Sequence, residues 1–232
     1  MGDRAVTVIT GTRKGIGRHL AQHYAERGHA VIGCSRGTPD WWLDGYEHVQ
    51  ADVSDEGAVG EVFERVRRHD RLDHLINNAG VARMNHSLLT PTSALATVLD
   101  TNVVGTFLFC REAARLMRRR RYGRIVNFST VAVPMKLEGE SVYAASKAAV
   151  EALTPIMARE FAPLGVTVNA LGPALVETDL TAGVPQPKLD EILAKQAIHR
   201  AGTPEEVAHV TDFFLSEQSG YVTGQTLYMG GP

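Results

Sequence analysis

A hydroxyl residue, a tyrosine and a lysine stand at intervals in the middle of the chain that suit proton transfer. Thr130 precedes Tyr143 by thirteen residues, and Lys147 follows Tyr143 by four. Residues four apart lie on one face of a helix, so the lysine ammonium is expected near the phenol. A nearby cation favours the phenolate and brings the pKa of tyrosine, ordinarily about 10, toward working pH. Such a tyrosine can protonate the alkoxide formed when a carbonyl is reduced, or act as a base in reverse.

The threonine has a second hydroxyl residue directly before it, Ser129. Successive residues of a strand point to opposite faces, so the two hydroxyls are not expected to face the substrate together. Counting back from Tyr143 selects Thr130, which keeps the donor and acceptor capacity of serine and adds a methyl group that restricts its rotamers. Two alternatives remain: a site weakened by the threonine, and a surface tyrosine that merely lies beside a lysine.

A glycine-rich turn follows the first strand-like run, in VITGTRKGIGRHLA. Gly11, Gly15 and Gly17, with Ile16 between the last two, allow a tight turn and let a pyrophosphate approach backbone N–H groups where a helix begins. Glycines also make plain turns, so the position between a strand and a helix is what favours dinucleotide binding.

The residues around the adenosine ribose predict the choice of cofactor. Ser35 and Arg36 end the second strand-like run, where an acidic residue would bind the ribose and repel a 2′-phosphate. Arg13 and Lys14 lie in the glycine turn on the same side, so three cations are expected around a 2′-phosphate. This favours NADP(H) over NAD(H). For each cation, and most of all for Arg13, the alternative is a side chain extended into solvent.

Short β-branched runs alternate with longer segments of helical spacing. The strand-like runs are 5–10, 30–35, 48–52, 74–77, 123–129, 166–171 and 225–229, and the helical segments are 16–27, 56–69, 93–117, 143–161 and 204–215. This alternation predicts a doubly wound α/β fold with a parallel sheet covered on both faces. No linker or repeat divides the chain, so 1–232 is expected to form a single domain. The crossover between Arg36 and His48 is too short for a full helix, and 181–200 is expected to be an excursion over the substrate pocket.

The glycine spacing after Thr10 resembles that of the short-chain dehydrogenase/reductase family, and further matches follow in the family's order. They are ADV at 51–53, NNAG at 77–80, Asn102 in TNVVG, the Tyr143 and Lys147 pair, VNALGPALVETDL from Val168, RAGTPEEVA and YVTGQTLYMGG. The resemblance covers nearly the whole chain and implies a Rossmann-type domain. Thr130 stands where the family usually has serine, and Ala174 stands where it usually has glycine.

The resemblance also implies roles for individual residues. Lys147 contacts the nicotinamide ribose beside Tyr143, and Asn102 holds a water that links the lysine to solvent. For Asn102 a plain position in a helix kink is the alternative. The remaining cofactor-binding positions implied are Asp52 and Val53 at the adenine, Asn78, Ala79 and Gly80 in the NNAG segment, and Pro173, Val176 and Thr178 on the nicotinamide side.

These residues predict an NADPH-dependent oxidoreductase that reduces a ketone to a secondary alcohol and catalyses the reverse reaction. The chain looks most like the 3-ketoacyl-carrier-protein reductase branch, whose carrier docks on basic residues. Arg121 matches one of these positions but Leu164 stands at another, so a free ketone or alcohol is at least as well favoured. The alternative from another class is a non-catalytic NADP(H)-binding regulatory protein. Met135 and Leu137 are expected to wall the pocket. Lys136, Glu138 and Glu140 are either polar contacts of the pocket or simple loop charges, and a loop charge is favoured for each.

The bulk properties bear on partners and compartment. A net charge of −2 gives no case for nucleic acid or an anionic membrane, and the basic run 118–121 fits a helix end. Cys34 and Cys110 lack zinc-like spacing and are expected to be buried free thiols, so no metal is expected. With no signal-peptide pattern and no stretch near membrane-spanning length, we expect a cytoplasmic protein. The resemblance implies that helices 93–117 and 143–161 pair across a two-fold axis in a homodimer or homotetramer.

Overall fold

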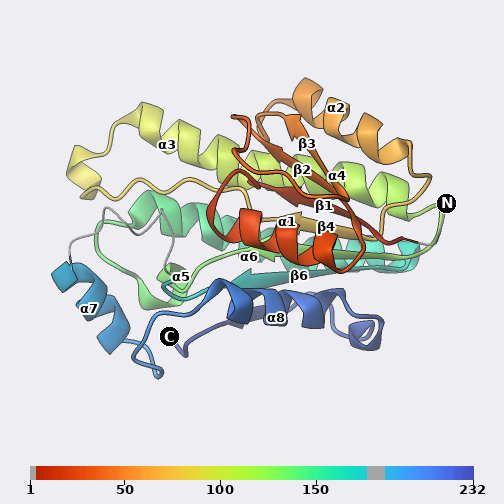
Figure 1. Cartoon of the computed structure of the whole chain (residues 1–232). Helices are drawn as coiled ribbons and strands as arrows, with labels where there is room; N and C mark the ends of the chain where they lie inside the picture. The colour runs from red at the N-terminus through yellow and green to blue at the C-terminus, as the bar shows by residue number, and fades with distance from the viewer. Residues whose placement is uncertain (1–3, 177–185) are drawn as a thin grey trace.

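A seven-stranded parallel sheet forms the centre of the molecule (Figure 1). The computed structural model describes residues 4–176 and 186–232. The strand order is β3-β2-β1-β4-β5-β6-β7, and each neighbouring pair is parallel. The strands are β1 Val6–Thr10, β2 Ala30–Ser35, β3 Tyr46–Gln50, β4 His74–Asn77, β5 Gly123–Phe128, β6 Val166–Gly172 and β7 Thr226–Tyr228. The predicted doubly wound α/β fold is confirmed, with one domain built around this sheet.

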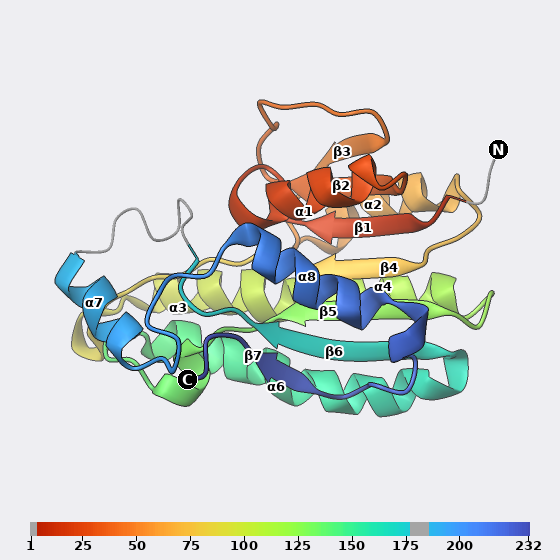
Figure 2. The same cartoon turned by 60° about the horizontal axis from the view of Figure 1, so that its bottom comes forward.

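Helices cover both faces of the sheet (Figure 2). The main helices are α1 Gly15–Glu26, α2 Glu56–Arg67, α3 Thr92–Leu99, α4 Gly105–Met117, α6 Ser141–Phe161 and α8 Pro204–Leu215. The shorter ones are α5 Ala132–Met135, α7 Gln186–Ala194, the 3₁₀ turns Ser87–Leu89, Ala162–Leu164 and Glu217–Ser219, and the π turn Asp100–Val104. One core cluster joins α2, α4 and α6 to the sheet, and a second joins α1 and α8 to the other face.

The strand order places the ligand crevice. The chain leaves β1 for β2 and β3 on one side and returns to β4 on the other, so crossovers diverge between β1 and β4. Doubly wound sheets bind ligands at this point, beyond the carboxyl ends of the strands. The glycine turn follows β1 and the NNAG segment ends and follows β4, so both predicted cofactor segments meet there. The described residues between β2 and β3 form no helix, as expected.

One long helix departs from the expectation that no stretch approaches the length of a membrane span. Thr92–Met117 runs for 26 residues without a break through the π turn, and an 18-residue window of it has a mean hydropathy of 1.4, enough to cross a membrane by length and composition alone. Its second half packs into the core through Phe109, Cys110 and Ala113. Its first half leaves Leu95 and Leu99 exposed. The apolar residues of this helix therefore lie partly against the core and partly on an exposed face.

Both cysteines are buried and free in the described part of the chain. Cys34 lies in β2 and Cys110 in α4, on the same core cluster. Burial raises the pKa of each thiol to about 12. Neither thiol is therefore an available nucleophile at neutral pH, because the thiolate is the reactive form.

Candidate active site

The glycine turn between β1 and α1 is shaped so that side chains are excluded from it. Gly11 and Gly15 have φ of 77° and 59°, the left-handed region that glycine enters without steric cost. At Gly17 a β-carbon would lie 2.3 Å from the Gly11 carbonyl oxygen, so any other residue would push the turn apart. The backbone where α1 begins is thus left open to a ligand, as a pyrophosphate requires.

A cleft of about 630 Å³ opens over this turn. Its volume is within the range of cofactor sites. The predicted residues that line it are Gly11, Arg13, Lys14, Gly15, Ile16, Gly17, Ser35, Arg36, Asp52, Val53, Asn78, Ala79 and Gly80. Sequence reasoning missed Gly37, Val81 and Thr101, which line the same cleft. Segments from five parts of the chain therefore form one continuous wall.

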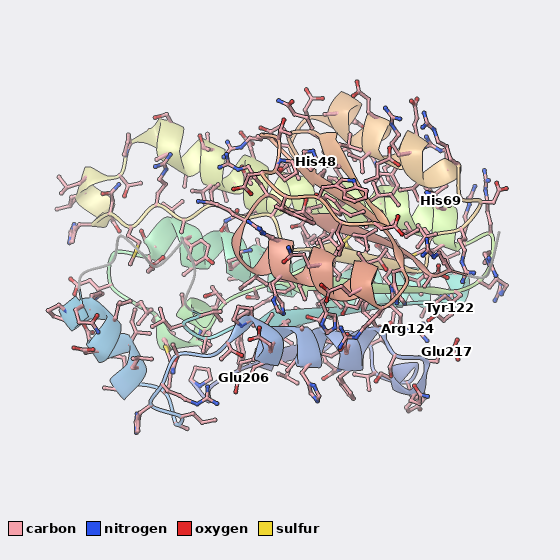
Figure 3. The ribbon with its side chains drawn as sticks, viewed as in Figure 1. His48, His69, Tyr122, Arg124, Glu206 and Glu217 are labelled. Carbon is pink, nitrogen blue, oxygen red and sulfur yellow. The ribbon has the colours of Figure 1, made fainter. Side chains whose placement is uncertain are left out.

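Basic side chains gather at the β2 end of this cleft. Arg13 lies against Gly37, whose missing β-carbon would be 3.3 Å from an Arg13 guanidinium nitrogen. The Ser35 hydroxyl donates to the Gly37 carbonyl at 2.8 Å and lies 2.9 Å from Nε2 of His48. His48, which is labelled in Figure 3, belongs to β3. Burial lowers the pKa of His48. The sequence does not single out His48, because its approach to Ser35 depends on the register between β2 and β3.

The carboxylate of Asp52, in the wall of this cleft, is held by two hydrogen bonds. It accepts hydrogen bonds from the Ser54 amide at 3.0 Å and the Ser54 hydroxyl at 2.7 Å. The backbone hydrogen bond is the largest cause that lowers the pKa of Asp52, and the charge of Arg36 adds to it. Asp52 is therefore an oriented, ionised acceptor.

The NNAG segment ties β4 to β1. Asn78 donates its side-chain amide to the Thr10 carbonyl at 2.9 Å, and the Ala79 amide donates to the Thr10 hydroxyl at 2.9 Å. Gly80 lies under two polar groups, since its β-carbon would be 3.3 Å from Nζ of Lys147 and 3.4 Å from Oδ1 of Asn102. These contacts hold the NNAG segment in place where the cleft over the glycine turn approaches Lys147 and Asn102.

Tyr143 and Lys147 lie together near the N-terminal end of α6. Nζ of Lys147 is 6.0 Å from the centre of the Tyr143 ring and donates to the Phe128 carbonyl at 2.8 Å. Burial lowers the pKa of Lys147 to about 8. Burial raises the pKa of Tyr143 to about 12, although a hydrogen bond from Thr130 lowers it. The expected fall in the tyrosine pKa is therefore absent from this structure, because desolvation of the phenolate is the larger effect.

The two hydroxyl residues that follow β5 make different hydrogen bonds, although both line one cavity. Ser129 is buried and donates to a carboxylate oxygen of Glu151 on α6, whose carboxylate also accepts from Tyr228 of β7. Thr130 hydrogen-bonds to Tyr143 and accepts from the Ala132 amide at 3.2 Å. Thr130 thus belongs with the tyrosine, and Ser129 belongs to a contact between β5, α6 and β7.

Asn102 is fully buried in the π turn of the long helix. Its side chain accepts from the Val81 amide at 2.9 Å and donates to the Val81 carbonyl at 3.0 Å and to the Ser146 hydroxyl at 2.9 Å. The Asn102 amide therefore joins the long helix to the residue that follows the NNAG segment and to α6. π turns often occur at functional sites. In this one Asn102 directly follows Thr101, which lines the cleft over the glycine turn.

A second cavity, of about 190 Å³, opens over Thr130, Tyr143 and Lys147. Pro173, Ala174 and Val176 line it after β6, together with apolar residues of α5 and α7. Ile16, Asn78, Gly80 and Val81 line both cavities. The loop at Ala174 is held by Gln196 and Gly202, which bind the Leu175 amide at 3.5 Å and the Leu175 carbonyl at 2.8 Å. The predicted position Thr178 lies outside the described residues.

Glu140 is the pocket residue that sequence reasoning assigned wrongly. It was expected to be a loop charge, yet it is 6% exposed and lines the cavity beside Tyr143. Leu137 lines the same cavity as expected, whereas Met135 packs behind it. The spacing of three residues between Glu140 and Tyr143 was a usable signal, because it spans nearly one helical turn.

Comparison with known proteins agrees with this arrangement. The family model described as enoyl-(acyl carrier protein) reductase matches residues 11–231. The 3-oxoacyl-[acyl-carrier-protein] reductase FabG of Escherichia coli strain K12 is 31% identical over 97% of this chain and 96% of its own. The proteins of the same name from Vibrio cholerae and Staphylococcus aureus are 33% and 32% identical, with the same coverage of both chains.

Solved structures share the fold over almost the whole length. ElxO with NADP bound has a TM-score of 0.89 at 28% identity and covers 97% of both chains. A putative gluconate dehydrogenase from Agrobacterium tumefaciens has a TM-score of 0.88 at 30% identity, covering 99% of this chain and 95% of its own. A 4-hydroxyisoleucine dehydrogenase complexed with NADH has a TM-score of 0.88 at 26% identity, covering 98% of both chains. Because the family model spans nearly the full length of the sequence, the chain belongs to the short-chain dehydrogenase/reductase family.

Proposed function

We propose that the protein is an NADPH-dependent oxidoreductase that reduces a ketone to a secondary alcohol and catalyses the reverse reaction. The observation that carries the proposal is the junction of the two cavities. The cleft over the glycine turn and the pocket over Thr130 and Tyr143 share their lining at Ile16, Asn78, Gly80 and Val81. A dinucleotide lying in the first would bring its reactive end to the hydroxyls of the second.

The residues present fit such a cofactor. The glycine turn excludes side chains from the pyrophosphate position, and Asp52 is an oriented acceptor near the adenosine. Arg13, Lys14 and Arg36 line the end where a 2′-phosphate would lie, and charge-assisted hydrogen bonds to a phosphate are the strong kind. ElxO, one of the structural neighbours, is an NADP-bound example of the fold. When bound, NADPH supplies the hydride.

In this proposal Thr130 and Tyr143 donate hydrogen bonds to the carbonyl oxygen, and Tyr143 gives it a proton. A phenol whose pKa burial raises to about 12 is protonated at neutral pH, so Tyr143 carries the proton that it gives to the carbonyl oxygen. Lys147, buried against the Phe128 carbonyl, is held where its ammonium stabilises the phenolate left behind. Asn102 links Ser146 of α6 to Val81, which directly follows the NNAG segment.

The direct test is NADPH oxidation across a panel of ketones. We expect turnover of at least one of them, with NADP⁺ reduction by the matching alcohol. NADPH binding without turnover of any compound, unchanged by Thr130→Ser, would instead support the regulatory NADP(H)-binding protein. The same panel names the substrate class, which the sequence leaves open.

Replacing Arg36 with aspartate should shift the preference from NADPH toward NADH. The change removes a 2′-phosphate partner and adds a carboxylate that repels it, so the ratio of affinities should fall by roughly 10- to 100-fold. Arg120→Asp makes the same charge change at an exposed residue beyond α4 and should leave the ratio alone. Equal NADPH affinity in the Arg36 variant and the parent would contradict the assignment.

A 3-ketoacyl-carrier-protein substrate is the second candidate. It is supported by the FabG relatives, whose names specify a 3-oxoacyl-[acyl-carrier-protein] substrate. Arg121 is exposed and available to an acidic carrier, but Leu164 stands where the branch has a second basic residue. Turnover of a 3-ketoacyl thioester on the carrier, and not of the free ketone, would favour this candidate.

We also propose a homodimer or homotetramer built on α3, α4 and α6. These helices and the π turn between α3 and α4 expose apolar side chains that are 36 to 55% exposed: Leu95, Leu99, Val104, Phe107 and Ile156. Light scattering at micromolar concentration should give at least twice the 25.2 kDa of one chain. Phe107→Asp should lower that mass, and Trp42→Asp, at an exposed residue between β2 and β3, should not. A mass of one chain for the parent protein would refute the assembly.

The cytoplasm is the compartment we propose for this enzyme. Both thiols are free and buried in the described residues, which suits a reducing compartment. We expect NADPH to be available to the enzyme in that compartment.

A further inference from the structure

Glu140 is a buried acidic residue, and one of its carboxylate oxygens has no hydrogen-bond partner in the described part of the chain. It is 6% exposed and lines the pocket that holds Thr130 and Tyr143. Its Oε2 atom is buried and has no hydrogen-bond partner among the described residues. A buried polar atom without a partner is unfavourable, and a buried charge without one is much more so.

The usual structural tasks of an acidic residue at this position are not performed by Glu140. It is the N-cap residue of α6, but its side chain makes no capping hydrogen bond. By contrast, Asp55 caps α2 by accepting from the Ala58 amide at 2.7 Å, and Thr203 caps α8. The cation that acts on Glu140 is Lys188 of α7, whose Nζ lies 3.4 Å from Glu191. Helix capping and a close ion pair therefore do not account for a glutamate at this position.

The cavity that Glu140 lines has apolar side chains in its wall. Leu137 and Ile192, 8% and 7% exposed, form a cluster with Ala132 at this part of the pocket. Burial raises the pKa of Glu140, and the charge of Lys188 opposes that change. The ionised carboxylate in turn contributes to the raised pKa of Tyr143, after the larger effect of burial. Glu140 is thus close enough to sense the reacting centre.

We propose that Glu140 is a substrate-recognition residue that accepts a hydrogen bond from an N–H or O–H group of the substrate. The pocket then takes ketones and secondary alcohols that carry a donor group, either a protonated amine or a hydroxyl, beside an apolar body. This inference rests on the proposed function and names its substrate class. The donor supplies the partner that Glu140 lacks, and a site built to bind a donor rejects the analogue without it.

The test uses three ketones of the same shape, with an ammonium, a hydroxyl or a methyl group at one position. For the parent enzyme we expect kcat/KM with a donor-bearing ketone to exceed that with the methyl analogue on the order of 10²-fold. Glu140→Leu should abolish this ratio. Glu140→Gln should keep it for a hydroxyl and lose it for an ammonium, which separates the two donors. Glu138→Gln, at an exposed glutamate two residues away, should keep the parent ratio.

Binding separates failure of this inference from failure of the proposed function. Calorimetry can measure how the matched secondary alcohols bind the NADP⁺-loaded protein without turnover. Donor-dependent binding that Glu140→Leu removes supports the inference even if no ketone is reduced. Turnover with equal kcat/KM for all three ketones overturns it.

Thermal unfolding provides the control for a structural role. Glu140→Leu should unfold at or above the parent temperature, since it replaces a buried group without a partner by an apolar one. A lower unfolding temperature together with an unchanged donor ratio would place Glu140 in the fold and overturn the inference.

Discussion

Replacing Tyr143 with phenylalanine should lower kcat for ketone reduction by about 10²- to 10⁴-fold, the usual contribution of a general acid. The ring stays, so packing against the cluster of Ala132, Leu137 and Ile192 should persist. NADPH affinity should change far less than kcat, because the glycine turn and the basic end of the cleft are untouched. Single-turnover kinetics with fluorescence-detected NADPH binding would measure both.

A matched control for this prediction is Tyr122→Phe. Tyr122 lies before β5, where Arg124 packs over its ring at 4.6 Å from the centre, and it lines neither cavity described above. This variant should keep the parent kcat. If Tyr143→Phe reduced ketones as fast as the parent, another group would have to be the acid.

Replacing Thr130 with valine should lower turnover on the order of 10²-fold, equivalent to ~3 kcal/mol of transition-state stabilisation. Valine keeps the shape and removes the hydroxyl that bonds to Tyr143. Thr130→Ser should retain most activity, because the donor survives. The measurement is kcat for the best ketone of the panel.

Ser129→Ala is the neighbouring control. Its hydroxyl donates to Glu151 on the far side of the strand end, so its loss should lower thermal stability more than turnover. If Ser129→Ala lost activity while Thr130→Val kept it, the assignment of the site would be wrong by one residue.

Much of the fold follows from local patterns. Alternation of apolar strands with amphipathic helices has only one common solution, a parallel sheet with both faces covered, and the structure has it. The position of the glycine turn follows from the glycine spacing between a strand and a helix. The steric exclusion at Gly11 and Gly17 also depends on Asn78, which is distant in the chain. Ser129 and Thr130 come directly after β5, which ends at Phe128, and their hydroxyls bind different partners, Glu151 and Tyr143. Boundaries were less exact, since β3 begins at Tyr46 rather than at residue 48.

The tertiary structure decided the electrostatics of the site. Two intervals predicted that Tyr143, Lys147 and Thr130 meet, but no interval predicts how much water each loses. Lys147 donates to Phe128 of a different element, and burial raises the pKa of Tyr143 to about 12. Desolvation depends on every segment that covers a group. The spacing of Tyr143 and Lys147 therefore cannot determine whether the pKa of the tyrosine rises or falls.

Glu140 shows the same limit most clearly. By sequence it resembles Glu138, another glutamate of the same loop, and both were interpreted as solvated charges. The structure leaves Glu138 exposed and buries Glu140 in the wall of a cavity. Ile192 of α7, more than fifty positions further along the chain, lines the same cavity. Local spacing determined which residues this protein has for proton transfer and cofactor binding. Packing between distant segments decided which carboxyl is buried beside them, because burial is a property of the assembled pocket and not of any one stretch of sequence.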